Sequence, residues 1–174
     1  MLKTPNQDEY QEYYEPYVKV IPQGDLLEIL KSQLSEMKLL IQGLTDEQAL
    51  YRYAPEKWSI KEVLGHVTDT ERIMSYRLLR IGRGDSTDLA GFDDQLYVRN
   101  ADFNRQSLSN LLQYFTATRQ STIALMPTLS DEAWLRRGTA NQTEVSARAL
   151  AYIIAGHERH HRQVIHDKYL AELR

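Results

Sequence analysis

Apolar residues recur every three to four positions over four long stretches of the chain, which is the period of an α-helix with one buried face. The four stretches span residues 26–41, 60–81, 108–125 and 147–169. Each follows a residue that can cap a helix N-terminus: Asp25, Ser59, Ser107 and Ser146. Glu62, three residues after Ser59, completes a capping box there. The pattern therefore predicts four helices of roughly 20 residues.

Strand signals are nearly absent, because alternating patterns and the Asn-Gly or Asp-Gly hairpin turns are missing. Residues 82–106 show no convincing periodicity and are expected to connect the second and third helices without regular structure. Connections this long inside compact domains are uncommon and often functional. We therefore expect an all-α fold, a four-helix bundle with a long crossover between helices two and three.

The segment before the first helix, residues 1–23, is polar and rich in tyrosine. Its tyrosines are Tyr10, Tyr13, Tyr14 and Tyr17. These rings favour packing over the end of the helical domain, with lining of a pocket as the alternative. We expect an N-terminal strap over residues 1–23 and a single helical domain over residues 24–174.

Composition excludes several classes of protein. The 174 residues include no cysteine, which removes disulfide scaffolds, iron–sulfur clusters and thiol nucleophiles, so any soft-metal site must use histidine. The net charge of −3 supplies no broad basic surface for nucleic acid. No apolar run approaches the roughly 18 residues of a membrane span, and the N-terminus lacks the apolar core of a signal peptide. A cytoplasmic protein with no nucleic-acid or membrane partner is the expectation.

The five histidines are the strongest chemical signal. His157 and His161 are one helical turn apart within the apolar stripe of the fourth helix, so both rings should face the interior. Burying unpaired polar rings costs roughly 1–3 kcal/mol each, which a shared metal ion would offset. His66 on the second helix is the third candidate ligand. His160 is the competing choice, although its phase places it at the helix edge, and His166 is expected to be solvated.

Residues 157–161 also match the H-E-x-x-H signature of zinc peptidases, in which Glu158 would be the general base. No third histidine follows at the spacing of the extended signature, because position 164 is valine. No strand-rich region is expected that would hold an extended peptide. A peptidase is therefore disfavoured.

Three segments together resemble the DinB/YfiT-like superfamily over about residues 20–170. They are the run from Lys57 to His66 followed by Asp69 and Glu71, Phe92–Asp93, and Ala155–His161. The resemblance implies a bundle of up-down-down-up topology and a divalent metal held by His66, His157 and His161, the set that burial phase proposes. It also implies a homodimer. Characterised relatives include bacillithiol- and mycothiol-dependent transferases or isomerases, and many members are described as metal-dependent hydrolases.

Three imidazoles leave a cation with open positions, as in catalytic rather than structural sites. Water or a thiol bound there is activated, so the same frame supports hydrolysis or thiol transfer. The leading hypothesis is a thiol S-transferase acting on a small electrophilic substrate, with Zn or Ni and a low-molecular-weight thiol as cofactors. A metal-dependent hydrolase and a non-catalytic metal- or ligand-binding module are the alternatives.

Further residues are candidates for supporting the site. Asp69 either orients His66 or pairs with Arg72, and Glu71 either pairs with an arginine or hydrogen-bonds near the metal. Glu158 and His160 complete this group. Four arginines are candidates for anchoring the negative groups of a thiol cofactor, against the commoner solvated role: Arg72, Arg77, Arg80 and Arg99. Asp93 and Tyr97 lie in the connection that could cover the site.

Overall fold

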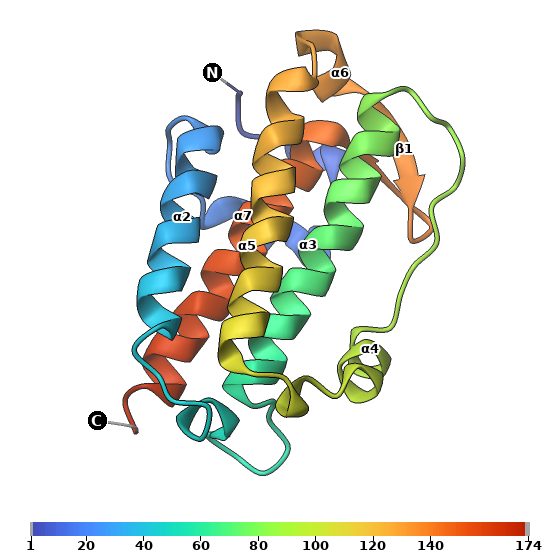
Figure 1. Ribbon diagram of the computed structural model, residues 1–174. Coiled ribbons are helices and arrows are strands. Elements are labelled where there is room, and N and C mark those ends of the chain that lie inside the picture. Colours follow the sequence, from blue (N-terminus) through green and yellow to red (C-terminus); the bar gives the residue numbers. More distant parts are fainter. Residues whose placement is uncertain (1, 173–174) are drawn as a thin grey trace.

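Four long helices form the body of the protein in the computed structural model, which describes residues 2–172 (Figure 1). They are α2 (Leu26–Ile41), α3 (Ile60–Gly82), α5 (Leu108–Leu125) and α7 (Ala147–Val164). Helix α3 packs against α5 and α7, and α2 packs against the same two helices, which closes the bundle into a ring. The predicted four-helix bundle is confirmed. Between residues 2 and 172, no helix is long and apolar enough to cross a bilayer.

The chain runs in an order that makes α3 and α5 parallel. In Figure 1 it descends α2, ascends α3, returns along the outside of the bundle through residues 83–107, and ascends again in α5 before descending α7. This is the up-down-down-up order that the family resemblance implies. The long crossover exists because two parallel neighbouring helices cannot be joined by a tight turn.

The predicted caps start the long helices. The side chains of Asp25, Ser59, Ser107 and Ser146 each accept a hydrogen bond from a backbone N–H in the first turn that follows. Glu62 returns a bond to the backbone of Ser59, which closes the capping box. The fourth helix differs slightly from the prediction, because α7 ends at Val164 and continues as a π-helix, Ile165–Tyr169. The Tyr169 hydroxyl in that wider turn donates to the Trp58 carbonyl at 2.7 Å.

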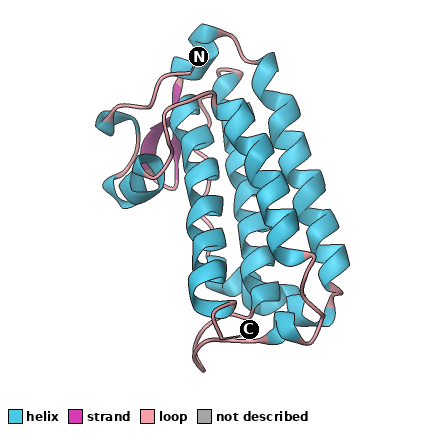
Figure 2. Cartoon of the chain, turned by 90° about the vertical axis from the view of Figure 1, so that its left-hand side faces the viewer, coloured by secondary structure: helices cyan, strands magenta, loops and turns pink. Residues whose placement is uncertain are grey.

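A β-hairpin between α5 and α7 departs from the prediction that strands are missing. Strands β1 (Arg137–Ala140) and β2 (Thr143–Ser146) pair antiparallel, with Ala140 opposite Thr143, after the short helix α6 (Asp131–Leu135). Asn141 and Gln142 both have positive φ, 52° and 65°, as a two-residue type I′ turn requires. An Asn-Gln turn lacks the usual glycine, so the sequence signal was weak. The hairpin lies beside one end of the bundle (Figure 2).

The connection between α3 and α5 is also more ordered than predicted. Leu89 forms a bridge to Ala140 of the hairpin. Helix α4 (Asp94–Ala101) follows, with Asp93 as its N-cap, and then a 3-10 turn, Phe103–Arg105. Its eight residues span about two helical turns, too few for the periodicity to stand out.

The N-terminal strap contains two 3-10 turns, Gln7–Glu9 and Glu12–Tyr14, and helix α1 (Glu15–Lys19), which packs along α7. The Glu9 carboxylate anchors the strap because it accepts hydrogen bonds from Ser146 and Arg148 at the start of α7. Two further 3-10 turns, Gln48–Leu50 and Met126–Thr128, lie in the remaining connections.

The buried core consists of two hydrophobic clusters, one toward each end of the bundle. On α2, Leu30 belongs to one cluster and Met37 to the other, and Gln33 lies buried between them. On α5, Arg119 occupies the same intermediate level and is 0% exposed. A polar layer therefore crosses the middle of the bundle, at the level of the histidines.

Candidate metal centre

Three histidines from two helices meet inside the bundle. His66 lies on α3, and His157 and His161 lie on α7. Each ring offers one nitrogen atom such that the three atoms lie within 4.8 Å of one another. The Nε2 atoms of His66 and His157 are 3.1 Å apart. His66 and His157 are buried and His161 is partly buried. The structure thus brings together the set that the sequence predicts.

The donor set fits a divalent cation. Two imidazole nitrogens bound to one tetrahedral ion at 2.0–2.1 Å lie about 3.3 Å apart, close to the 3.1 Å between His66 Nε2 and His157 Nε2. Zinc, nickel and similar ions favour nitrogen donors of this type. A cluster of three histidines leaves at least one position for a further ligand.

Burial keeps the three rings neutral, as metal binding requires. Desolvation lowers the pKa of His66 to about 4, which the nearby Asp94 carboxylate only partly opposes. Desolvation also lowers the pKa of His161 to about 3, with repulsion from His66 and His160 adding to it. His157 is shifted in the same direction for the same first reason. At neutral pH each ring has a free lone pair.

Aromatic rings restrict the orientations of the imidazoles. The Trp58 indole lies 4.7 Å from the His66 ring, centroid to centroid. On the other side, the Tyr17 ring meets the edge of His157 at 5.5 Å. Trp58 directly precedes the N-cap of α3, so its contact with His66 is local in sequence. Tyr17 belongs to α1, which is far in sequence from the helix α7 that carries His157.

A glycine precedes each of His66 and His157, and both glycines allow another segment to touch the helix. A Cβ on Gly156 would overlap the backbone carbonyl of Tyr17, and one on Gly65 would lie 2.5 Å from the Phe103 ring. Any larger residue would push the strap or the crossover away from the helix. The Gly-His pairs are therefore close-packing points next to the site.

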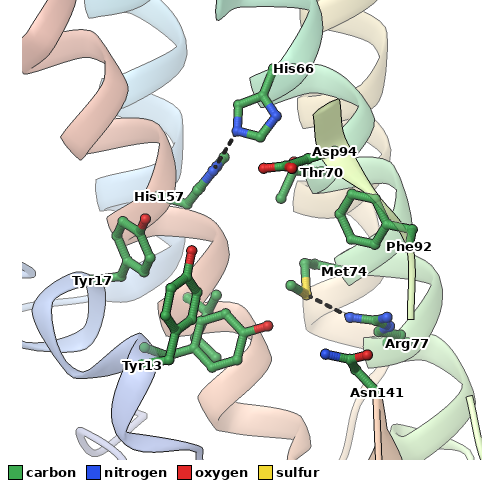
Figure 3. Close-up of a pocket in the computed structure, with 12 residues that line it drawn as sticks. Tyr13, Tyr17, His66, Thr70, Met74, Arg77, Phe92, Asp94, Asn141 and His157 are labelled. Carbon is green, nitrogen blue, oxygen red and sulfur yellow. Dashed lines mark hydrogen bonds between the residues drawn. The ribbon is translucent and has the colours of Figure 1, made fainter. Parts of the chain in front are cut away.

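A pocket of about 250 Å³ opens from His66 and His157 (Figure 3). Its walls come from the strap, α3, α7, the crossover and the hairpin turn: Tyr13, Tyr14, Tyr17, His66, Thr70, Met74, Arg77, Phe92, Asp94, Asn141, Ile153 and His157. Three of the four strap tyrosines line this pocket, which was the alternative to the favoured packing over the end of the domain. Tyr10 is buried in the core.

A second cavity of about 290 Å³ reaches the cluster from the other side, at His161. Trp58, Gln95 and His160 are among the residues that line it. The exposed His160 contacts the edge of His161 at 5.1 Å, as expected of a helix-edge position. His166 is exposed and pairs with Asp167, also as predicted.

The carboxylates expected near the metal take other partners. Asp69 accepts a hydrogen bond from the Tyr114 hydroxyl at 2.7 Å, and burial raises its pKa. Glu71 forms a bidentate pair with Arg119 at 2.8 Å. No hydrogen bond of either residue within residues 2–172 goes to a histidine. The orienting role for Asp69 is thus not what the structure shows, and for Glu71 the arginine alternative is correct.

Glu158 lies on a different face of α7 from His157 and His161. Its Oε1 accepts from Arg162 at 2.8 Å, and its buried Oε2 has no hydrogen-bond partner among the described residues. Burial raises its pKa to about 7, against the opposing effect of Arg119 and Arg162. Arginines, and not the histidines, are therefore the groups that act most strongly on this carboxylate, so the structure does not support a peptidase-like base at the metal.

Several pocket residues escaped the sequence reasoning. Thr70 lies one turn after His66, and helical spacing could have identified it. Asn141 and Asp94 reach the pocket through the hairpin turn and the crossover, whose paths the sequence did not predict. Asp93 caps α4, while Tyr97 is exposed and contacts the Phe92 ring at 5.4 Å.

Comparisons with known proteins agree with this architecture. The structure is similar to that of YfiT from Bacillus subtilis, described as a probable metal-dependent hydrolase with an unusual four-helix bundle topology, with a TM-score of 0.78 and 16% sequence identity over 98% of this chain and 93% of that one. At this identity the likeness establishes the fold. No protein of curated function matches the sequence. The family model of the DinB superfamily matches residues 29–165, most of the chain. The chain therefore belongs to the DinB superfamily.

Proposed function

We propose that the protein is a metal-dependent enzyme that hydrolyses a small molecule, with a divalent ion, zinc or nickel, bound by His66, His157 and His161. One observation carries the proposal: three neutral histidine nitrogens within 4.8 Å of one another lie at the wall of a pocket. A purely structural ion is more often enclosed by four protein ligands. The description of YfiT as a probable metal-dependent hydrolase supports the same chemistry.

The residues of the chain divide the work between binding and exclusion of water. A bound ion of this kind supplies a Lewis acid and an activated water at neutral pH. The three imidazoles hold the ion with their lone pairs. Tyr17 and Trp58 restrict the imidazole rings and shield them from bulk solvent. Asp94, at the same end of the pocket, can accept a proton or a hydrogen bond from a ligand.

Thiol transfer is the second candidate, and the two cavities favour it. One cavity reaches the cluster at His66 and His157, and the other reaches it at His161. A transfer reaction needs room for two organic substrates, whereas hydrolysis needs room for one. The chain has no cysteine, so the thiol would come from solution.

Elemental analysis of untagged protein tests the metal site. The wild-type protein and the His66→Ala, His157→Ala and His166→Ala variants are purified without a metal-affinity column. We expect about one equivalent of zinc or nickel in the wild type and in the control His166→Ala, and little in the other two. Equal metal content in all four proteins, or none after titration with zinc, would contradict the proposal.

Activity assays then separate the two chemistries. If the protein is a hydrolase, hydrolysis of p-nitrophenyl acetate should be faster with the wild type than with His157→Ala. If thiol transfer is the reaction, the protein should accelerate the consumption of 1-chloro-2,4-dinitrobenzene, and it should do so only when L-cysteine is added. The homodimer that the resemblance implies stays a prediction, which sedimentation analysis of the same samples would test.

A further inference from the structure

Arg77 is a buried cation in the pocket without an anionic partner among residues 2–172. Its side chain is 3% exposed. Its Nη2 donates to the Ala90 carbonyl at 2.6 Å, its Nη1 contacts Met74 Sδ at 3.5 Å, and the Phe92 ring lies 5.7 Å from its Cζ. No ion pair joins it to a carboxylate anywhere in residues 2–172. Burying an unpaired charge is costly, and burial lowers the pKa of this guanidinium, which the neighbouring Tyr14 hydroxyl only partly opposes.

The other arginines that the sequence suggested as anchors do not line this pocket. Arg72 donates to Tyr114 and Thr118 on α5. Arg80 pairs with Asp85. Arg99 is exposed on α4. Arg77 alone among these four is both buried and part of the pocket wall.

Arg77 retains capacity to bind a ligand. A guanidinium has five N–H donors, and two nitrogens make the hydrogen bonds of the described structure. Figure 3 shows the group at the end of the pocket opposite His66, near Asn141. The neutral groups around it, a carbonyl, a thioether and the Tyr14 hydroxyl, orient the side chain without neutralising its charge.

Thr70 supplies a second unsatisfied group in the same pocket. Its Oγ1 is buried and has no hydrogen-bond partner within the described part of the chain. It lies on α3 between His66 and Arg77, and the Cα atoms of those two residues are separated by about 16 Å of helix rise. Buried hydroxyls are normally paired, so a bound molecule is the natural partner for this one.

We propose that the pocket binds an elongated small molecule through a carboxylate that pairs with Arg77, with Thr70 contacting its middle and the reacting bond at the histidine end. A guanidinium matches a carboxylate in shape and charge. Asp94 at the histidine end would repel a second anionic group, which favours a monocarboxylate over a polyanion. The placement of the reacting bond rests on the proposed function, whereas the binding of the carboxylate does not.

Calorimetric titration with a matched pair of probes tests the proposal. The probes are 3-phenylpropanoate and the neutral 3-phenylpropanamide, whose phenyl group suits the aromatic pocket wall. They are titrated into the full chain, both metal-loaded and metal-stripped, at pH 7. The variants are Arg77→Gln, Arg77→Lys and the control Arg72→Gln, with circular dichroism to verify folding.

We expect the wild type to bind the carboxylate at least tenfold more tightly than the amide in both metal states. Arg72→Gln should keep this preference, Arg77→Lys should keep part of it, and Arg77→Gln should lose it. Equal binding of the two probes by the wild type would overturn the proposal without any variant. A preference that survives in Arg77→Gln, or that disappears when metal is removed, would also overturn it, because the anion would then be bound elsewhere or by the metal.

These outcomes are distinguishable from failure of the proposed function. A protein that holds no metal and hydrolyses nothing can still show the preference for the carboxylate in the metal-stripped titration. Conversely, an active hydrolase that binds both probes equally retains its function and refutes the role of Arg77.

Discussion

Replacing Arg119 with methionine tests how the polar layer holds the four long helices together. The Arg119 side chain is 0% exposed. It donates to both carboxylate oxygens of Glu71 on α3, to Gln33 Oε1 at 3.0 Å and to the Leu30 carbonyl on α2. Gln33 in turn donates to the Ala155 carbonyl on α7 at 2.9 Å. One guanidinium therefore connects α5 to the other three helices.

The expected loss of stability is large because Glu71 would remain buried without its partner. Removing one member of a buried ion pair costs about 3–5 kcal/mol, and the lost hydrogen bond to Gln33 adds about 1 kcal/mol. A domain of this type is stable by about 5–15 kcal/mol. The variant Arg119→Met should therefore lose a large share of the total free energy of unfolding.

Urea unfolding followed by far-ultraviolet circular dichroism measures the effect. The double variant Glu71→Leu/Arg119→Met should recover most of the loss, because apolar side chains can replace a buried pair at little cost. Arg105→Met is the control, since Arg105 is 85% exposed in its pair with Asp102 and should change stability by less than about 1 kcal/mol. A loss below about 1 kcal/mol in Arg119→Met, or a double variant no more stable than the single one, would refute the reasoning.

Three further outcomes are expected. Gly156→Ala should force the Tyr17 carbonyl to retreat by roughly 1 Å and lower stability by about 2 kcal/mol net of the gain in helix propensity, and an unchanged melting temperature would contradict this close contact. Although burial raises the pKa of Glu9, hydrogen bonds from Arg148 and Ser146 lower it from 4.5 to about 2. Because the folded-state pKa is depressed, this carboxylate contributes on the order of 3 kcal/mol to the free energy of unfolding. The contribution is fully present above about pH 4.5 and is lost as the pH falls toward 2. Glu9→Gln should therefore weaken the decrease of stability at acid pH. Removing a metal present at about a hundred times its Kd should lower the melting temperature of the wild type by roughly 5–10 °C and leave that of His157→Ala unchanged. Equal shifts in the two proteins would show that the metal binds elsewhere.

The sequence predicted the long helices well because the signals for them are local. Apolar periodicity and a capping side chain act over one or two turns of the same segment. The histidine cluster was also predictable, since His157 and His161 are neighbours on one helix face and His66 lies on the buried side of another. The shorter elements were missed. Helix α4 has too few residues to show a period, and the hairpin turn uses Asn141-Gln142 in place of a glycine-containing pair.

The pocket beside the histidines could not be predicted from the sequence, because its walls come from segments far apart in the chain. Tyr17 reaches His157 through the contact of α1 with Gly156, and Asn141 reaches the same space from the hairpin. Nothing within either segment indicates its partner. The same holds for the polar layer, in which Arg119 was not predicted to meet Glu71. The sequence by itself determined the helices and the candidate ligands of the histidine site, since both follow from the positions of residues on the buried faces of individual helices. Only the tertiary structure decided which side chains surround that site and which charges remain unpaired, because those depend on packing between distant segments.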